Sequence, residues 1–131
     1  MTSVPSKRRD TSTGWVLEQM VLPALQRGEY ECRVQVDVGA RLGHGRHFVD
    51  AVVEKDGVRI LVSVKWQQTS GTAEQKVPFE VMCLAEALRT PDFARAYLVL
   101  GGEGWKLRPF FTSGELGRRI VSADRVHVAL A

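Results

Sequence analysis

The sequence predicts an α/β fold in which a mixed sheet joins an antiparallel three-strand meander to a parallel strand that follows a helix. Three observations predict it. Residues 31–38 alternate apolar and polar side chains, Asp56-Gly57 separates two further strand-like runs, and the short apolar run 96–100 follows a helical stripe. With 131 residues there is room for one hydrophobic core, so we expect a single domain over residues 12–131.

The composition excludes several classes of protein. Hydrophobic residues make up 44% of the chain and charged residues 25%, as in ordinary globular proteins, and no apolar run approaches the roughly 18 residues of a membrane helix. The first ten residues lack the apolar segment of a secretory signal. Cys32 and Cys83 form no metal or redox motif, so we expect free thiols in a cytoplasmic protein without membrane contact.

The first predicted elements are an arm and a helix. Residues 1–11 are polar and basic, which predicts a flexible N-terminal arm. Thr11-Ser-Thr13 offers N-caps for a helix over residues 15–26, in which Glu18 shares the face of the apolar positions. Pro23 should bend or break this helix, because proline lacks the amide hydrogen that bonds the preceding turn.

Three strands follow the helix. In the first, residues 31–38, strict alternation points the apolar side chains to one face and leaves the other face wet. These apolar residues are Cys32, Val34, Val36 and Val38. A glycine-rich loop spans residues 39–46, and the strands 47–54 and 58 to about 67 then form a hairpin around Asp56-Gly57.

The second half of the chain continues with a helix. It begins either at a capping box formed by Thr72 and Gln75 or with Pro78 in its first turn, and it ends before Pro91. The remaining predicted elements are a buried parallel strand at 96–100, a short helix at about 115–120 and a strand at 126–130.

The hairpin brings an acid and a lysine close together. If Asp56 and Gly57 form a two-residue turn, Asp50 lies opposite Ser63, and Lys65 is its diagonal neighbour at roughly 7–8 Å. The other side chains on this face are Phe48, Val52 and Leu61. A charge on such an apolar surface costs several kcal/mol unless it is paired or binds a metal. The pair is therefore either a functional site or a structural ion pair.

The pattern Asp50 followed by Ser63-Val64-Lys65 resembles the signature of the PD-(D/E)XK nuclease superfamily. There a carboxylate on one strand and an acid-x-Lys motif on its antiparallel neighbour bind a divalent metal. The predicted element order over roughly residues 12–100 is similar to the restriction-endonuclease-like core of that superfamily. The resemblance implies a metal-dependent endodeoxyribonuclease that hydrolyses phosphodiester bonds, with Mg²⁺ or Mn²⁺ as cofactor and DNA as partner.

Two positions depart from the signature. Val49 stands where the signature has proline, and Ser63 stands where it has an acid, although serine is a poor metal ligand. Similar restriction endonucleases that read Ser-x-Lys take the missing carboxylate from the following helix, where this chain has Glu80, with Glu74 as the alternative. The metal ligands that the resemblance implies are Asp50, Glu80, Glu18 and the backbone carbonyl of Val64, and the implied catalytic residues are Asp50, Lys65, Glu80 and Gln67.

The net charge of +3 suits a polyanionic partner. Around a nuclease site, basic and polar residues of the arm and loops become candidate DNA contacts. These are Lys7, Arg8, Arg9, Arg41, His44, Arg46, Gln68 and Ser70. We expect His44 and His47, which flank the glycine-rich loop, to be loop residues facing DNA rather than metal ligands.

A core this small leaves little room for elements that read base edges. We therefore expect a structure-selective enzyme similar to Holliday-junction resolvases, which are small basic homodimers of this superfamily. The acid missing at Ser63 instead favours a small restriction-type endonuclease, or a non-catalytic nucleic-acid-binding module with a degenerate site. A homodimer is expected of an enzyme that cuts both strands and has exposed strand edges.

Overall fold

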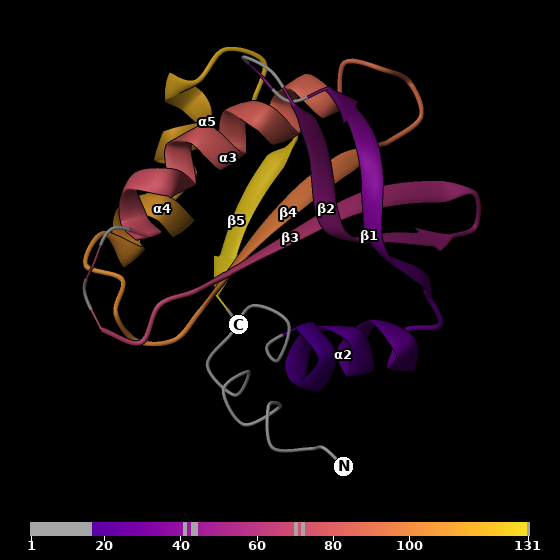
Figure 1. The fold of residues 1–131 in the computed structure, drawn as a ribbon, viewed down its shortest axis with the longest axis horizontal. Coiled ribbons are helices and arrows are strands. Elements are labelled where there is room, and N and C mark those ends of the chain that lie inside the picture. Colours follow the sequence, from indigo (N-terminus) through magenta and orange to yellow (C-terminus); the bar gives the residue numbers. More distant parts are fainter. Residues whose placement is uncertain (1–16, 41, 43–44, 70, 72, 131) are drawn as a thin grey trace.

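The computed structural model describes residues 17–40, 42, 45–69, 71 and 73–130. One five-stranded sheet has the order β1-β2-β3-β4-β5, with β1 to β3 antiparallel and β3 to β5 parallel (Figure 1). The strands are β1 Glu31–Ala40, β2 Arg46–Lys55, β3 Val58–Trp66, β4 Arg95–Gly101 and β5 Val126–Leu130. This mixed sheet confirms the predicted α/β fold. The predicted arm, residues 1–11, lies outside the described residues.

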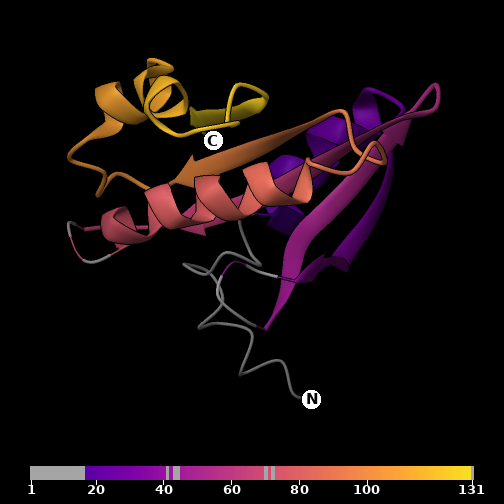
Figure 2. The same cartoon turned by 90° about the horizontal axis from the view of Figure 1, so that it is seen from above.

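The helices are distributed over both faces of the sheet. They are the π-helical turn η2 Leu17–Val21, α2 Leu22–Arg27, α3 Ala73–Ala87, α4 Arg108–Thr112 and α5 Glu115–Arg119. Figures 1 and 2 show α3, α4 and α5 near one another, whereas α2 lies apart from them. Within the described ranges, no helix is both long and apolar enough to cross a membrane.

Two apolar clusters hold the sheet between these helices. The α3-side core packs Val52 and Leu61 of the hairpin, with Leu98 of β4, against the inner face of α3. The α2-side core packs the alternate positions of the same strands against Leu17 and the partly buried residues of α2. Side chains of a strand alternate between faces, so a sheet covered on both sides needs apolar residues at successive positions. The burial of Ala51, Val52 and Val53 follows from this.

The β2–β3 hairpin has the predicted register. Asp56 and Gly57 have φ angles of 55° and 79°, as a type I′ turn requires, and the pairing runs from Lys55 with Val58 to Ala51 with Val62. Glycine at the second turn position adopts positive φ without the steric cost of a side chain. The turn therefore fixes which residues of β2 and β3 face each other.

Two local predictions are wrong. Pro78 lies inside α3, which already begins at Ala73, so the alternative start at Pro78 is excluded. Glu18 is exposed rather than on the inner face, because the first helix opens as a π-helical turn that buries Leu17 instead. Pro23, as expected, breaks this helix: α2 begins anew at Leu22, with the proline in its first turn.

The alternation of β1 is also not the uniform one predicted. Cys32 packs on the α2-side core, whereas Val36 and Val38 pack on the α3-side core and Val34 is exposed. Between them, Gln35 has a φ of 52°, in the left-handed region. A residue in that conformation interrupts the extended backbone, so the side-chain alternation does not continue through it.

Candidate active site

A pocket of about 350 Å³ lies where β2, β3 and α3 meet. It is lined by Arg46, His47, Phe48, Asp50, Ser63, Val64, Lys65 and Glu80. The pocket therefore contains both residues of the motif, Asp50 and Lys65, together with the glutamate proposed to replace the missing acid. Each comes from a different element of the fold.

Asp50 lies where the β2–β3 backbone pairing stops. The last pair is Ala51 with Val62, and one residue further the Asp50 carboxylate accepts a hydrogen bond from the Val64 amide, with Oδ2 2.6 Å from the nitrogen. Figure 2 shows β1 and β2 running at an angle to the line of β3 and β4. The aspartate side chain thus bonds a backbone amide at the end of the ladder, which fixes the carboxylate at the pocket.

Gln35 approaches Asp50 from the edge strand. It lies between the pairs Val34–Ala51 and Val36–Val49, so Asp50 is the residue opposite it. The Gln35 side chain is hydrogen-bonded to the Asp50 carboxylate. A left-handed φ of 52° at a non-glycine residue costs about 1–3 kcal/mol, and such strain concentrates at functional sites.

Glu80 reaches the pocket from α3 and fills the place left by the serine. The Ser63 hydroxyl donates a hydrogen bond to Glu80 Oε2 at 2.9 Å, and His47 Nε2 lies 3.3 Å from the same oxygen. His47 is buried, with 4% of its surface exposed. Ser63 and His47 therefore hold the glutamate in one orientation.

The two carboxylates have pKa shifts of opposite sign. Burial raises the pKa of Asp50, with a further increase from the negative charge of Glu80, and these outweigh the Val64 hydrogen bond and the charge of Lys65. Burial also acts to raise the pKa of Glu80, but the hydrogen bonds from His47 and Ser63 and the charge of Lys65 hold it below its ordinary value. Glu80 is therefore ionised at neutral pH, and the Asp50 charge is the less compensated one.

Mg²⁺ in proteins is usually bound by one or two carboxylates and keeps several waters. Asp50 and Glu80 supply two such carboxylates in one polar pocket, and a cation would offset the uncompensated charge of Asp50. Among the described residues, no three His, Cys, Asp or Glu side chains are grouped as a metal site. The residues present thus fit a cation bound through two carboxylates and water, and not a dedicated protein cage.

Three of the predicted site residues lie elsewhere. Glu18 is exposed on η2, which packs on the other face of the sheet. The Glu74 carboxylate accepts a hydrogen bond from the Leu107 amide at 2.7 Å, which leaves Glu80 as the glutamate of the pocket. Gln67 is buried, and its amide donates to the Gly104 carbonyl at 2.8 Å, so it supports the loop after β4 and does not line the pocket.

The predicted DNA contacts are described only in part. Arg46 lines the pocket, where its guanidinium is paired with Asp37, and Gln68 is exposed just after β3. The remaining candidates lie outside the described residues: Lys7, Arg8, Arg9, Arg41, His44 and Ser70. The expectation for His47 is wrong, because it is a buried residue of β2 that contacts Glu80.

Sequence reasoning missed Gln35 and His47, and it placed Phe48 on the buried face although its side chain is 55% exposed. Alternation extended from Val52 predicts a buried Phe48, but the strand pair changes face near Asp50. The sequence places His47 at the start of a strand, but it does not show that α3 packs over this position and brings Glu80 to the histidine. Nothing in the sequence marks the backbone conformation of Gln35.

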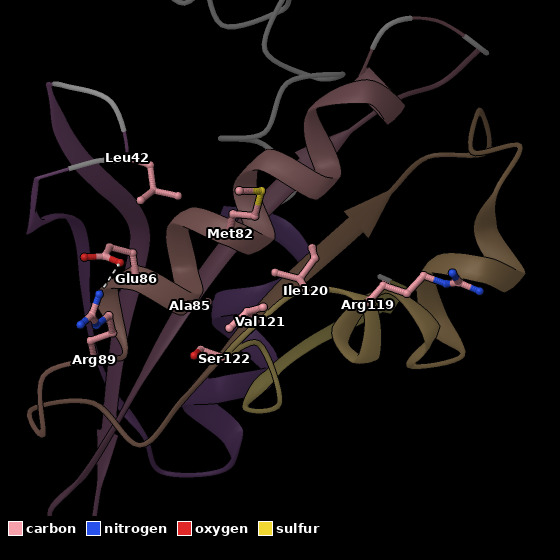
Figure 3. Close-up of a pocket in the computed structure, with 9 residues that line it drawn as sticks. All are labelled: Leu42, Met82, Ala85, Glu86, Arg89, Arg119, Ile120, Val121 and Ser122. Carbon is pink, nitrogen blue, oxygen red and sulfur yellow. Dashed lines mark ion pairs between the residues drawn. The ribbon is translucent and has the colours of Figure 1, made fainter.

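A larger pocket, of about 610 Å³, is lined by residues of α3, by Leu42 and by residues 119–122, and it carries no such constellation. Figure 3 shows its lining, in which Met82 and Val121 are apolar, Glu86 and Arg89 pair at 3.5 Å, and Arg119 points away from that pair. Glu86 on α3 and Arg89 just after it form an exposed ion pair, and no second acid of the described lining stands beside them to share a metal ion. The chemistry of this chain is therefore sought in the smaller pocket.

Comparison with known proteins agrees with this geometry. The family model of the PD-(D/E)XK nuclease superfamily domain matches residues 9–109, which include Asp50, Lys65 and Glu80. The chain belongs to this superfamily. Its members are nucleases, and they generally use divalent metal ions. Among curated proteins, none matches the sequence.

Two solved structures are similar to this PD-(D/E)XK domain. One is the crystal structure of a protein of unknown function, AF1548, with a TM-score of 0.52 and 15% identity over 85% of this chain and 54% of that chain. The other is Pyrococcus furiosus SfsA in complex with Ca²⁺, with a TM-score of 0.42 and 18% identity over 87% of this chain and 52% of that chain. The chain thus spans about half the length of each, and the first similarity supports the fold alone.

Proposed function

We propose that this protein is a divalent-metal-dependent DNA endonuclease that hydrolyses phosphodiester bonds and selects its substrate by DNA structure, as Holliday-junction resolvases do. The observation that carries the proposal is Glu80 bound to Ser63 in one pocket with Asp50 and Lys65. The acid missing from the signature is thereby supplied from α3.

Mg²⁺ or Mn²⁺ would be held by Asp50 and Glu80, with the Val64 backbone carbonyl as a further ligand. Bound there, such an ion would neutralise charge on the phosphate and lower the pKa of the attacking water. Both of the contacts that hold Glu80 fall on Oε2, which allows Oε1 to be presented to the pocket.

The chain's own residues then position the reacting groups. Lys65 lines the same pocket as the two carboxylates and supplies a fixed positive charge for the scissile phosphate, whose negative charge grows in the transition state. Gln35 and the Val64 amide orient Asp50, as Ser63 and His47 orient Glu80. Ligands held in this way need little rearrangement when substrate binds.

DNA is the proposed partner and a homodimer the proposed form, because cutting two strands of a junction needs two sites. Structure selection is proposed because a nuclease core of this kind contacts DNA mainly through the sugar–phosphate backbone, which carries shape and no base sequence. Arg46 beside the pocket is a phosphate contact in this proposal. Gln68 is a second one.

The test is cleavage of labelled four-way junction, flap, single-stranded and linear duplex DNA with Mg²⁺, with Mn²⁺ and with EDTA. Asp50→Asn and Glu80→Gln should each abolish cutting, whereas Glu74→Gln, a matched change on the same helix, should leave it intact. Loss of the ligands should also weaken Mn²⁺ binding measured by calorimetry. Metal-independent cutting, or full activity of Glu80→Gln, contradicts the proposal.

Ser63 and the absence of a third grouped ligand in the described residues favour a second candidate, a DNA-binding module without catalysis. It predicts salt-dependent DNA binding, no heat of Mn²⁺ binding in calorimetry and no cutting of any substrate. A restriction-type enzyme, by contrast, would cut linear duplex at one sequence.

A further inference from the structure

Phe48 is an aromatic side chain that the fold itself does not use. It lies on β2 between His47 and Val49, whose side chains are 4% and 0% exposed, yet Phe48 is 55% exposed. Within the part of the chain that the structure describes, it belongs to neither the α3-side core nor the α2-side core. More than half of this apolar ring therefore stays in contact with water, where it can pack against a binding partner.

Phe48 also lies beside the candidate active site. Among the described residues, it is the one exposed large hydrophobic side chain that lines the pocket of Asp50, Lys65 and Glu80. Two residues along a strand span roughly 7 Å, so the Phe48 backbone is about that far from Asp50. A nucleotide whose phosphate lies at the carboxylates would carry its base, or that of its neighbour, within reach of the ring.

The surroundings of the ring suit a nucleic-acid strand. Arg46 lines the same pocket two residues before Phe48, and its guanidinium is oriented by Asp37, with Nε 2.6 Å from Oδ2. A guanidinium has five N–H donors, so those outside this pairing can still bond a phosphate. An aromatic ring next to a fixed cation is the combination that binds a single strand, since the ring stacks on a base while the cation bonds the backbone.

We propose that Phe48 stacks on an unpaired base next to the scissile phosphate, so that, among the structured DNAs that this nuclease selects, those with single-stranded nucleotides at the cleavage point bind best. Bases in a regular duplex are stacked on each other and present no face to a side chain, whereas a flap, bubble or open junction does. The inference rests on the proposed function, because a phosphate held at Asp50 and Lys65 is what brings a base to Phe48.

The first measurement is binding in EDTA, where no cutting occurs. Wild type, Phe48→Leu and Phe48→Trp are titrated with flap, single-stranded and linear duplex DNA, using 2-aminopurine next to the flap junction as a stacking probe. Loss of one base stack costs about 1–3 kcal/mol, so Phe48→Leu should weaken flap and single-strand binding about 5- to 150-fold and leave duplex binding unchanged. Phe48→Trp should retain both the affinity and the quenching of the probe.

Phe79 provides the matched control, because it is another exposed phenylalanine, 46% accessible, that does not line the pocket. Phe79→Leu should leave all three affinities unchanged. An equal loss on every DNA, or no loss on the flap, overturns the inference, as does a Phe48→Leu effect on the oligomeric state alone, measured by sedimentation.

The same proteins are then assayed with Mg²⁺, which separates the two proposals. Wild-type cutting with a preference for flaps that Phe48→Leu retains overturns the stacking inference and leaves the nuclease intact. If wild type cuts no DNA with either metal, the proposed function fails instead, whatever the binding shows.

Discussion

Acidic and basic side chains face each other across β2 and β3 at both ends of the hairpin. Near the turn, Glu54 is paired in register with Arg59, with 3.6 Å between carboxylate and guanidinium and both side chains more than a third exposed. At the open end, Asp50 and Lys65 line a pocket that α3 covers with Glu80. Water screens the first pair, whereas Asp50 and Lys65 line a partly buried pocket, so a charge affects its neighbours more strongly there than near the turn.

The two ends also differ in how the backbone is completed. At the turn, paired residues continue to Lys55 and Val58, and no polar side chain is needed to bond the strands. At the open end the pairing stops at Ala51, and the Asp50 carboxylate takes the amide of Val64. The site therefore depends on where the β2–β3 backbone pairing ends and on which helix covers that end.

The largest effect on activity is expected when the basic side chain at each end of the hairpin is replaced in turn. Lys65→Met should lower the rate of metal-dependent DNA cleavage about 10²- to 10³-fold, the usual effect of deleting one group that stabilises transition-state charge. Arg59→Met, the matched change near the turn, should leave the rate within about twofold, because surface charges contribute little. Single-turnover cleavage at saturating enzyme measures both, and equal losses would mean that the two ends are not functionally distinct.

A smaller effect is expected from alanine substitutions at two glycines, Gly57 in the turn and Gly102 at the end of β4. A Cβ added to Gly102 would lie 2.3 Å from the Gln67 carbonyl oxygen, and its φ of 88° is left-handed, so Gly102→Ala should lower the free energy of unfolding by about 3–5 kcal/mol. Gly57, in the turn, has a φ of 79° but no atom within 4 Å of that position. Gly57→Ala should therefore cost about 1–2 kcal/mol.

Urea unfolding followed by circular dichroism measures these two values. The comparison is informative because Gln67, which Gly102 approaches, continues β3 past Lys65. A Gly102→Ala protein as stable as Gly57→Ala would show that the loop after β4 does not hold the strand end that carries Lys65.

The register of the β2–β3 hairpin is the feature that the sequence predicts best. Asp56-Gly57 specifies a type I′ turn, the turn specifies the register, and the register brings Asp50 and Ser63 to the same end of the two strands. Glu80 follows from the vacancy at Ser63 together with a helix in the right place. The register is confirmed as far as Ala51 and Val62, because it depends on local turn chemistry and on a period of two, whereas the role of Glu80 stays a prediction.

The rest depends on contacts between elements far apart in sequence. Whether His47 is buried is decided by the packing of α3, and Gln67 is held by Gly104, 37 residues further on. β1 changes face at Gln35, where the sequence pattern still alternates, and Phe48 on the neighbouring strand is exposed although alternation predicts it buried. Periodicity describes a regular strand and therefore fails where the strand is interrupted, which here is at the site.

The smallest expected effect is on stability, and it distinguishes the buried acid Asp50 from the exposed acid Glu54. Because burial raises the pKa of Asp50 above its ordinary value of 3.8, the folded protein binds that proton more tightly than the unfolded chain does. Stability from this group is therefore lost as the pH rises from 3.8 through the raised pKa, and the loss is complete above it. Asp50→Asn removes the loss and can still accept the Val64 hydrogen bond.

In EDTA at neutral pH, Asp50→Asn should accordingly be more stable than wild type, by about 0.5–2 kcal/mol, the range of single substitutions that relieve a functional site. The difference should shrink as the pH falls toward 3.8. Glu54→Gln should change stability by less than about 0.5 kcal/mol. Thermal unfolding across this pH range measures all three proteins, and a less stable Asp50→Asn would mean that the contacts with Val64 and Gln35 outweigh burial. Adding Mn²⁺ should reverse the order, because a ligand that binds the folded state stabilises only the proteins that retain its carboxylates.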